Sequence, residues 1–180
     1  KLLENSTDLN GINTKIEVIT GELNGQNAPN PPLGSWAFDA SNQVSILNIQ
    51  IEANGECLLP KTSKESNRTV YFYQGSNLLI EDELIPEYHA AVVNPSIDLK
   101  LKNNSSEIIK ILILQGKPIN EPVVQHGPFV MNSRKEIQEA FDDYHRTQFG
   151  GWPWPKYDQV HKRSLGRFAK HANGDVETKE

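Results

Sequence analysis

Apolar and polar residues alternate in short segments between residues 15 and 115, and turn-forming residues separate the segments. A period of two places every second side chain on the same face, which is typical of antiparallel strands. The turns include Asn54-Gly55 and Asn94-Pro95. The pattern predicts short strands at 15–20, 35–38, 43–52, 56–59, 69–74, 78–81, 89–93, 97–102 and 107–114. This spacing favours an all-β jelly-roll barrel or sandwich over a fold that alternates strands and helices.

The predicted strand at 43–52 changes phase along its length. Val44 and Ile46 follow one alternation, whereas Leu47, Ile49 and Ile51 follow the opposite one. An extra residue in one strand of a pair produces such a shift, so the phase change predicts a β-bulge.

A different periodicity begins at residue 133 and predicts one C-terminal α-helix. Ser133 and Glu136 have the spacing of a capping box. Gly150-Gly151 is a suitable end for the helix. Apolar residues follow at helical spacing, namely Ile137, Ala140, Phe141 and Tyr144. We expect this stripe to pack against the outside of the barrel.

The remaining segments suggest how the chain is organised. The pattern predicts a leader or inter-domain segment at 1–14, one domain at 15–150, and a Trp/Pro-rich and basic extended tail at 151–180. The proline-containing loop at 24–34 either covers the mouth of the barrel or merely connects two strands.

Composition and charge narrow the class of protein. The apolar fraction of 37% and mean hydropathy of −0.55 are ordinary for a water-soluble domain, and no segment approaches the ~20 apolar residues of a membrane span. The net charge of −5 argues against general affinity for nucleic acid. The first residues lack the features of a signal peptide, so we expect a cytoplasmic protein. The single cysteine, Cys57, excludes an internal disulfide and is predicted to be a buried strand residue.

Residues 121–132, with the sequence EPVVQHGPFVMN, join the predicted barrel to the predicted helix. This string resembles the segment that precedes the final helix in the C-terminal half of the pirin family. The resemblance implies a cupin-type jelly roll with a terminal helix. Complete pirins resemble bicupins whose N-terminal cupin binds iron, and some act as quercetin dioxygenases or as transcriptional co-regulators.

The resemblance allows the general cupin metal motif, G-x5-H-x-H-x4-E-x6-G followed by P-x-G-x2-H, to be placed on this sequence. Its two outer glycines match Gly55 and Gly75, and its proline matches Pro86. The four positions that carry metal ligands in the motif are occupied by Lys61, Ser63, Arg68 and Ala91.

These four residues are poor ligands for a divalent metal. Protonated lysine and arginine offer no lone pair, and their charge repels a cation. His89 and His126 are the remaining candidates, but one lies on a predicted strand and the other in the segment before the helix. No nucleophile elbow or phosphate loop is present either. We therefore expect no catalytic residue, metal or cofactor in this chain, and iron only in an N-terminal cupin.

Two interpretations of the substituted positions stay open. Lys61, Ser63 and Arg68, with Phe72 on the same face, are predicted to point into the barrel and hold a small anion. Alternatively, Arg68 pairs with a carboxylate such as Glu65 or Glu56 and fills the interior, which we favour because buried charges are usually paired.

Three functional hypotheses follow from the resemblance. The first is a non-catalytic structural or binding half that packs against a metal-bearing N-terminal pirin cupin, on the same or a separate chain. The second is a part of an iron-dependent quercetin 2,3-dioxygenase-like enzyme. The third is a regulatory module in which residues 120–132 or the tail dock a protein regulator. None of these involves nucleic acid or a membrane directly.

Overall fold

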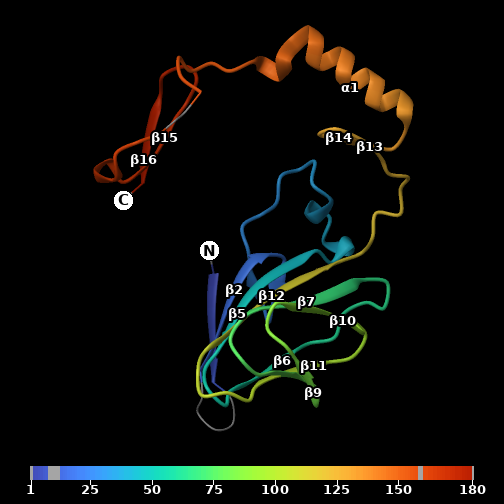
Figure 1. Cartoon of the computed structure of the whole chain (residues 1–180), viewed down its shortest axis with the longest axis vertical. Coiled ribbons are helices and arrows are strands. Elements are labelled where there is room, and N and C mark those ends of the chain that lie inside the picture. Colours follow the sequence, from blue (N-terminus) through green and yellow to red (C-terminus); the bar gives the residue numbers. More distant parts are fainter. Residues whose placement is uncertain (1, 8–12, 158–159, 180) are drawn as a thin grey trace. The chain divides into compact units, whose positions relative to one another are not determined.

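The computed structural model describes residues 2–7, 13–157 and 160–179, which divide into two compact units, Lys1–Ile119 and Asn120–Glu180. The division falls after Ile119, within the segment 15–150 that the sequence suggested as one domain. The first unit is built from two antiparallel sheets (Figure 1). Among the described residues, the two larger sheets form a jelly-roll sandwich and not one closed barrel, in agreement with the predicted fold class.

The larger sheet has six strands in the order β1-β2-β5-β12-β7-β10. Its strands are β1 (Leu2–Thr7), β2 (Asn13–Thr20), β5 (Ser45–Ile51), β12 (Ile109–Gly116), β7 (Asn67–Gln74) and β10 (His89–Val93). The smaller sheet has four strands in the order β6-β11-β8-β9. These are β6 (Glu56–Leu59), β11 (Leu99–Asn103), β8 (Leu78–Ile80) and β9 (Glu83–Ile85). Most predicted strands are therefore confirmed, with shifts of one or two residues at their ends.

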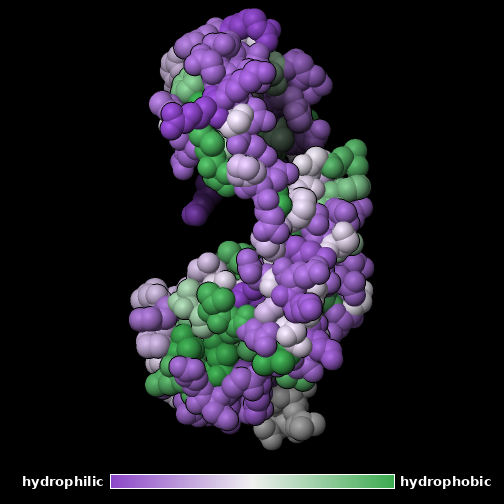
Figure 2. All heavy atoms as spheres, turned by 90° about the vertical axis from the view of Figure 1, so that its right-hand side faces the viewer, coloured by the Kyte–Doolittle hydropathy of each residue, from purple (hydrophilic) through white to green (hydrophobic). Residues whose placement is uncertain are grey.

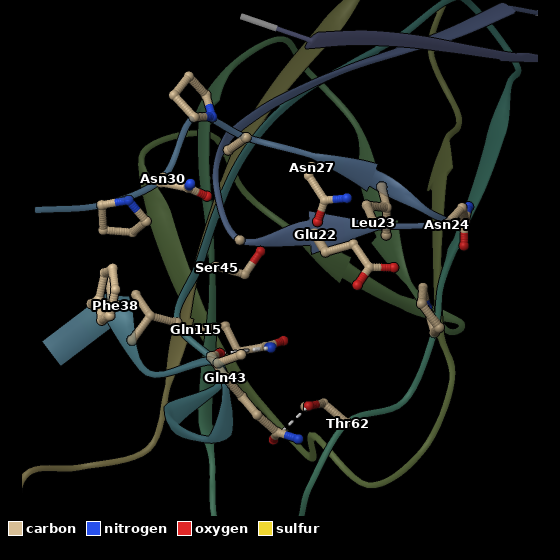
Figure 3. A pocket seen from close by; sticks show the side chains of 18 residues that line it. Glu22, Leu23, Asn24, Asn27, Asn30, Phe38, Gln43, Ser45, Thr62 and Gln115 are labelled. Atoms are coloured by element: carbon tan, nitrogen blue, oxygen red, sulfur yellow. Dashed lines mark hydrogen bonds between the residues drawn. The ribbon is translucent and has the colours of Figure 1, made fainter. Parts of the chain in front are cut away.

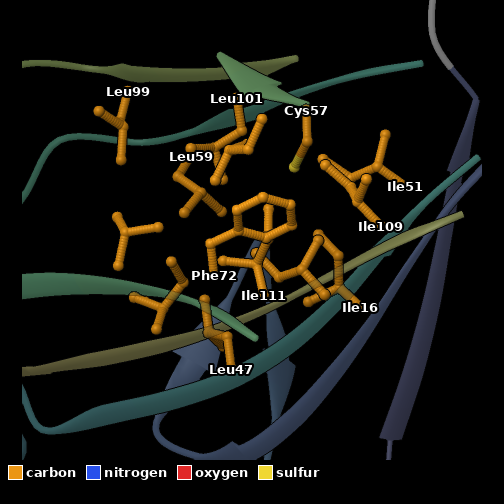
Figure 4. Packing of buried hydrophobic residues seen from close by; sticks show 14 of the residues in the cluster. Ile16, Leu47, Ile51, Cys57, Leu59, Phe72, Leu99, Leu101, Ile109 and Ile111 are labelled. Carbon is orange, nitrogen blue, oxygen red and sulfur yellow. The ribbon is translucent and has the colours of Figure 1, made fainter. Parts of the chain in front are cut away.

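The core lies between the two sheets and consists of the alternate residues of their strands (Figure 4). Ile49, Phe72 and Ile111 come from the larger sheet, and Leu59 and Leu101 face them from the smaller one. All five side chains are almost completely removed from solvent. Cys57 is also buried in this cluster, as predicted. Burial of apolar area on both inner faces fixes the register, because a slip of one residue would expose every core side chain.

The bulge predicted in the segment 43–52 lies on the neighbouring strand instead. In β5 the buried positions alternate without interruption. The register shifts in β2, where Val18 pairs with Leu47 and Thr20 with Ile46, so that Ile19 is the extra residue. The prediction was wrong about the strand, because Val44 precedes β5 and Ile46 belongs to its outer face.

A second prediction was wrong at residues 35–38. This segment forms a short 3₁₀ helix, η1 (Trp36–Phe38), followed by η2 (Ala40–Asn42). The side-chain oxygens of Ser35 and Asp39 cap the two turns by accepting hydrogen bonds from backbone N–H groups. These local bonds compete with strand formation. A two-strand hairpin, β3 (Glu22–Leu23) and β4 (Gln26–Asn27), precedes them.

The second unit contains the predicted helix, α1 (Arg134–Thr147). The capping box is present: the Ser133 hydroxyl accepts from the Glu136 N–H at 3.2 Å, and the Glu136 carboxylate accepts from the Asn132 N–H at 3.1 Å. The helix ends earlier than predicted, at Thr147, because Gln148 adopts a left-handed conformation before the two glycines are reached. A 3₁₀ turn, η3 (Gln148–Gly150), follows.

The apolar stripe of α1 packs against a hairpin that the sequence did not predict, β13 (Val124–His126) and β14 (Phe129–Met131). Ile137 and Ala140 are buried, and the Phe141 ring meets the Phe129 ring edge-on at 4.8 Å between centroids. Within the second unit, the stripe thus packs on this hairpin; its packing against the outside of the barrel stays a prediction. The expected extended tail contains η4 (Arg163–Leu165) and a further hairpin, β15 (Arg167–Lys170) and β16 (Val176–Lys179).

Candidate ligand-binding site

A cavity of about 460 Å³ lies in the first unit, at the end of the sandwich where the β3–β4 hairpin and the two short 3₁₀ helices meet (Figure 3). The proline-containing loop contributes Asn30 and its neighbouring prolines to the lining. This loop therefore borders a cavity, and its covering of a barrel mouth stays a prediction. Amide side chains supply much of the polar lining, namely Asn24, Asn27, Asn30, Gln43 and Gln115.

Gln43 organises the polar groups on one side of this cavity. Its backbone is left-handed, with φ of 52°, and its side-chain oxygen accepts three hydrogen bonds. The donors are the Thr62 hydroxyl at 2.8 Å, the Ser63 N–H at 3.1 Å and the Ser66 hydroxyl at 3.0 Å. The Gln115 side-chain amide donates to the Gln43 backbone carbonyl at 3.2 Å. The loop between β6 and β7 is thereby fastened to the start of β5 and the end of β12.

Arg68 lies deeper, on β7, and is 5% exposed. Its Nε donates to the Gln115 side-chain oxygen at 2.8 Å, and one Nη donates to the Pro60 carbonyl at 2.8 Å. The second Nη is buried and has no hydrogen-bond partner. Burial lowers the pKa of the Arg68 guanidinium, while the negative charge of Asp98 acts in the opposite direction. An arginine starts from so high a pKa that it stays charged at neutral pH.

A smaller cavity of about 120 Å³ adjoins Arg68 and shares residues with the larger one. Ser45, Thr62 and Gln115 line both. Its apolar lining consists mainly of Leu23, Leu47, Leu59 and Ile113, of which Leu23 also lines the larger cavity. The carboxylate residue Glu22 also lines both cavities. The arrangement combines one buried cation, a ring of amides and hydroxyls, and an apolar wall, which are features of a binding pocket for a small polar molecule.

Two of the four predicted binding residues, Lys61 and Arg68, line the smaller cavity. Arg68 is buried there as predicted, and Lys61 lines it although the residue is exposed overall. Ser63 is half-buried in the loop before β7, where its hydroxyl accepts from the Glu65 N–H at 3.2 Å. Phe72 shares the inward face with Arg68, but it lies within the core and lines neither cavity.

The carboxylates expected to pair with Arg68 are bonded elsewhere. Glu65 forms an ion pair with Lys117 at 3.0 Å, and Glu56 forms ion pairs with Lys100 and Lys102, each at 3.2 Å. The expectation was wrong because Gln115 lies opposite Arg68 in the β12–β7 ladder, and its side-chain oxygen accepts the hydrogen bond from the Arg68 Nε. Sequence analysis missed Gln43, Gln115 and the Pro60 carbonyl, since no motif marks them.

The cupin ligand positions do not fit a divalent metal. Lys61 and Arg68 are cations, Ser63 is held by loop hydrogen bonds, and Ala91 packs against the core. His89 is exposed on β10 of the first unit, and His126 belongs to the second unit, where its ring contacts Phe141. Within residues 2–7, 13–157 and 160–179, no group of three or more His, Cys, Asp or Glu residues is placed to hold a metal ion.

In the same ranges, no helix combines the length and apolar content of a membrane span.

The two facing antiparallel sheets of the first unit and the spacing of Gly55 and Gly75 are those of a cupin-type domain. Residues 46–150 match the pirin C-terminal cupin domain. The chain belongs to this family.

Similar proteins agree with this assignment. A pirin-like protein of Solanum lycopersicum is 39% identical over 80 residues, which cover 43% of this chain and 28% of the relative. A putative quercetin 2,3-dioxygenase of Vibrio cholerae is 30% identical over 138 residues, covering 77% of this chain and 43% of the relative. This chain thus spans less than half the length of both relatives. A crystal structure of quercetin 2,3-dioxygenase from Acinetobacter baumannii has a TM-score of 0.63 at 23% identity, covering 83% of this chain and 48% of that chain, and so shares the fold.

Proposed function

We propose that this chain is a non-catalytic binding and structural half that acts beside a metal-bearing N-terminal pirin cupin. One observation carries the proposal: the place of a cupin metal ligand is taken by Arg68, a buried cation that is bonded to neutral oxygens. A permanent positive charge at this depth repels a divalent ion. The short coverage of the relatives supports a partner cupin, on the same or a separate chain.

Metal analysis of the purified chain tests this proposal. We expect less than about 0.1 equivalent of iron, nickel or zinc after incubation with each ion and desalting, because the donor set lacks imidazole and carboxylate. The double substitution of Lys61→His and Arg68→Glu restores part of the donor set and serves as a comparison. Stoichiometric iron in the unsubstituted chain would contradict the proposal.

A second candidate is that the complete protein is an iron-dependent dioxygenase acting on flavonols, and that this half shapes its active site. The observation that favours it is the description of several relatives as putative quercetin 2,3-dioxygenases, including one of Pseudomonas aeruginosa that is 37% identical over 100 residues. Quercetin turnover should then be absent for this chain alone and should appear when it is combined with an N-terminal cupin. The two candidates are separated by comparing the N-terminal cupin alone with the same cupin combined with this chain. Equal rates of quercetin turnover in the two samples would favour the first candidate.

A further inference from the structure

Arg68 carries a hydrogen-bonding capacity that its surroundings do not satisfy. Two of its three nitrogens are bonded to the neutral oxygens of Gln115 and Pro60, whereas the remaining Nη is buried without a partner. Buried donors are almost always paired, and a charged donor loses most by being left alone. An unpaired guanidinium nitrogen in a residue that is 5% exposed therefore indicates a group that the protein itself does not provide.

The carboxylates near Arg68 do not supply a hydrogen-bond acceptor for its unpaired Nη. Asp98 lies near enough to raise the pKa of Arg68, but its oxygen accepts the Lys61 backbone N–H at 2.7 Å. Glu22 lines the cavity, and its oxygen accepts the Gly25 N–H at 3.0 Å. Within the described ranges, no carboxylate is hydrogen-bonded to the guanidinium.

The adjoining cavity has room for such a group. Its volume of about 120 Å³ is far above the ~10–15 Å³ that one water molecule requires. Lys61 adds a second cation to the lining, and Leu47, Leu59 and Ile113 form an apolar wall. The cavity shares lining residues with the larger space of about 460 Å³, which leads to the amide side chains shown in Figure 3.

These features distinguish among anions. The unpaired Nη can donate a charge-assisted hydrogen bond to one carboxylate oxygen, and the apolar wall suits the hydrocarbon part of a small acid. Glu22 adds negative charge at the same cavity and so disfavours dianions such as sulfate and hydrogen phosphate. We propose that the cavity beside Arg68 binds a small monocarboxylate, with the carboxylate on the unpaired Nη and the rest of the molecule against Leu47, Leu59 and Ile113.

This inference rests on the proposed function, because it assigns a ligand class to a half that acts by binding. Sodium acetate is the probe, added at pH 7 to the full chain with sodium chloride adjusting each sample to one ionic strength. We expect the Tm to rise with the acetate concentration, in proportion to its logarithm once the site is filled, as binding to the folded state alone requires. Amide NMR spectra should show saturable shifts in the side-chain amide of Gln115 and in Thr62. Sodium sulfate should have no saturable effect on these signals.

Two variants provide the comparison. Arg68→Met removes the charge and retains most of the side-chain volume, and we expect it to weaken acetate binding by at least about tenfold. Lys64→Met removes one exposed cation nearby that lines neither cavity and should bind acetate as the wild type does. If Arg68→Met does not fold, the NMR titration of the wild type still tests the proposal, because saturable shifts are expected only at residues that line the cavity.

Three outcomes would overturn the inference: shifts that grow linearly and spread over surface lysines, equal binding by Arg68→Met, or a Tm that depends on ionic strength alone. Each of these results would show that acetate does not bind at the unpaired Nη of Arg68. The metal content of the same samples is measured in parallel. Absence of acetate binding in metal-free protein would refute the carboxylate site alone, whereas stoichiometric iron would refute the proposed function.

Discussion

Asn103 is a single residue that holds two parts of the sandwich together. Its side chain is fully buried on β11. The amide nitrogen donates to the carbonyls of Ile51 at 3.1 Å, Glu52 at 2.9 Å and Glu107 at 2.7 Å. The amide oxygen accepts from the Ser105 N–H at 3.0 Å and from its hydroxyl at 2.7 Å. One amide therefore satisfies the backbone where β5 ends and where the loop before β12 turns.

Replacing Asn103 by alanine should destabilise the first unit by about 2–3 kcal/mol, because several buried polar groups lose their partner at once. The free energy of unfolding measured in urea, with an unchanged m-value, is the readout. Asn104→Ala removes the same side chain from the neighbouring exposed position and should change the stability by less than about 0.5 kcal/mol. Equal effects of the two substitutions would contradict this role of Asn103.

The sequence could predict the burial of Arg68 but not its partners. Its burial follows from the position it occupies in a strand with Val70 and Phe72 on the same face. Its bonds to Gln115 and Pro60 depend on the register between β7 and β12 and on the path of a loop, neither of which is visible in local composition. The small cavity could not be predicted for the same reason.

At the scale of elements, β6 and β11 are joined by a charge cluster on their outer faces. Glu56 on β6 lies opposite Lys102 on β11 and contacts both Lys102 and Lys100 at 3.2 Å. The hydrogen bond from Lys102, followed by that from Lys100, lowers the pKa of the Glu56 carboxyl from its ordinary value of 4.5. Opposite charges on neighbouring strands support the pairing between them.

The lowered pKa of Glu56 predicts a stability that depends on pH. A carboxyl with a lower pKa in the folded state contributes stability at pH values above its ordinary pKa, and that contribution is lost as the pH falls through the folded value. The Tm should therefore decline below about pH 5, and Glu56→Gln should reduce the decline. Because the cluster is partly exposed, 1 M salt should diminish the difference between the two proteins.

Scanning calorimetry between pH 3 and pH 7 provides the measurement for this prediction. Glu52→Gln is the matched control, since it removes one exposed carboxylate from the same unit. A Tm profile for Glu56→Gln that runs parallel to the wild type at all pH values would show that the cluster does not support the sheet.

Elements with a buried face were predictable, whereas short elements held by local hydrogen bonds were not. The strands of the sandwich and α1 carry their periodicity in the sequence, since one face of each is apolar. The 3₁₀ turn η1 was mistaken for a strand because the hydrogen bond that the Ser35 side chain accepts at its start outweighs three residues of strand-like composition. The hairpin of β13 and β14 was missed because its strands have three residues each, too few to show an alternation.

For the molecule as a whole, the distribution of buried residues separates the two units. The apolar core cluster lies entirely within the first unit, from Ile16 to Ile113. In the described part of the second unit, the buried hydrophobic residues are Ile137 and Ala140. Figure 2 also shows hydrophobic side chains gathered on the side of the first unit that carries β9 and β10, where Leu84 and Val92 are 55% and 83% exposed.

Residues 1–119 alone should therefore unfold cooperatively, with a free energy of unfolding within about 1 kcal/mol of the first unit in the full chain. Residues 120–180 alone should unfold without a sharp transition, because two buried residues and a set of aromatic edge contacts make too small a core. Circular dichroism during urea unfolding of the three chains provides the measurement. Loss of the β-sheet signal in residues 1–119 would show instead that the two units are one folding unit.

The fastening of the β6–β7 loop by Gln43 has a consequence for motion. The three groups that donate to its amide oxygen belong to the loop. The same loop is also held by the Thr62 N–H, which donates to the Pro95 carbonyl at 2.7 Å. Release of this loop would exchange polar partners for water, whereas the apolar core cluster, which includes none of the three donors, would keep its contacts. We therefore expect access to the cavity beside Arg68 to require local opening of this loop and not unfolding of the sandwich.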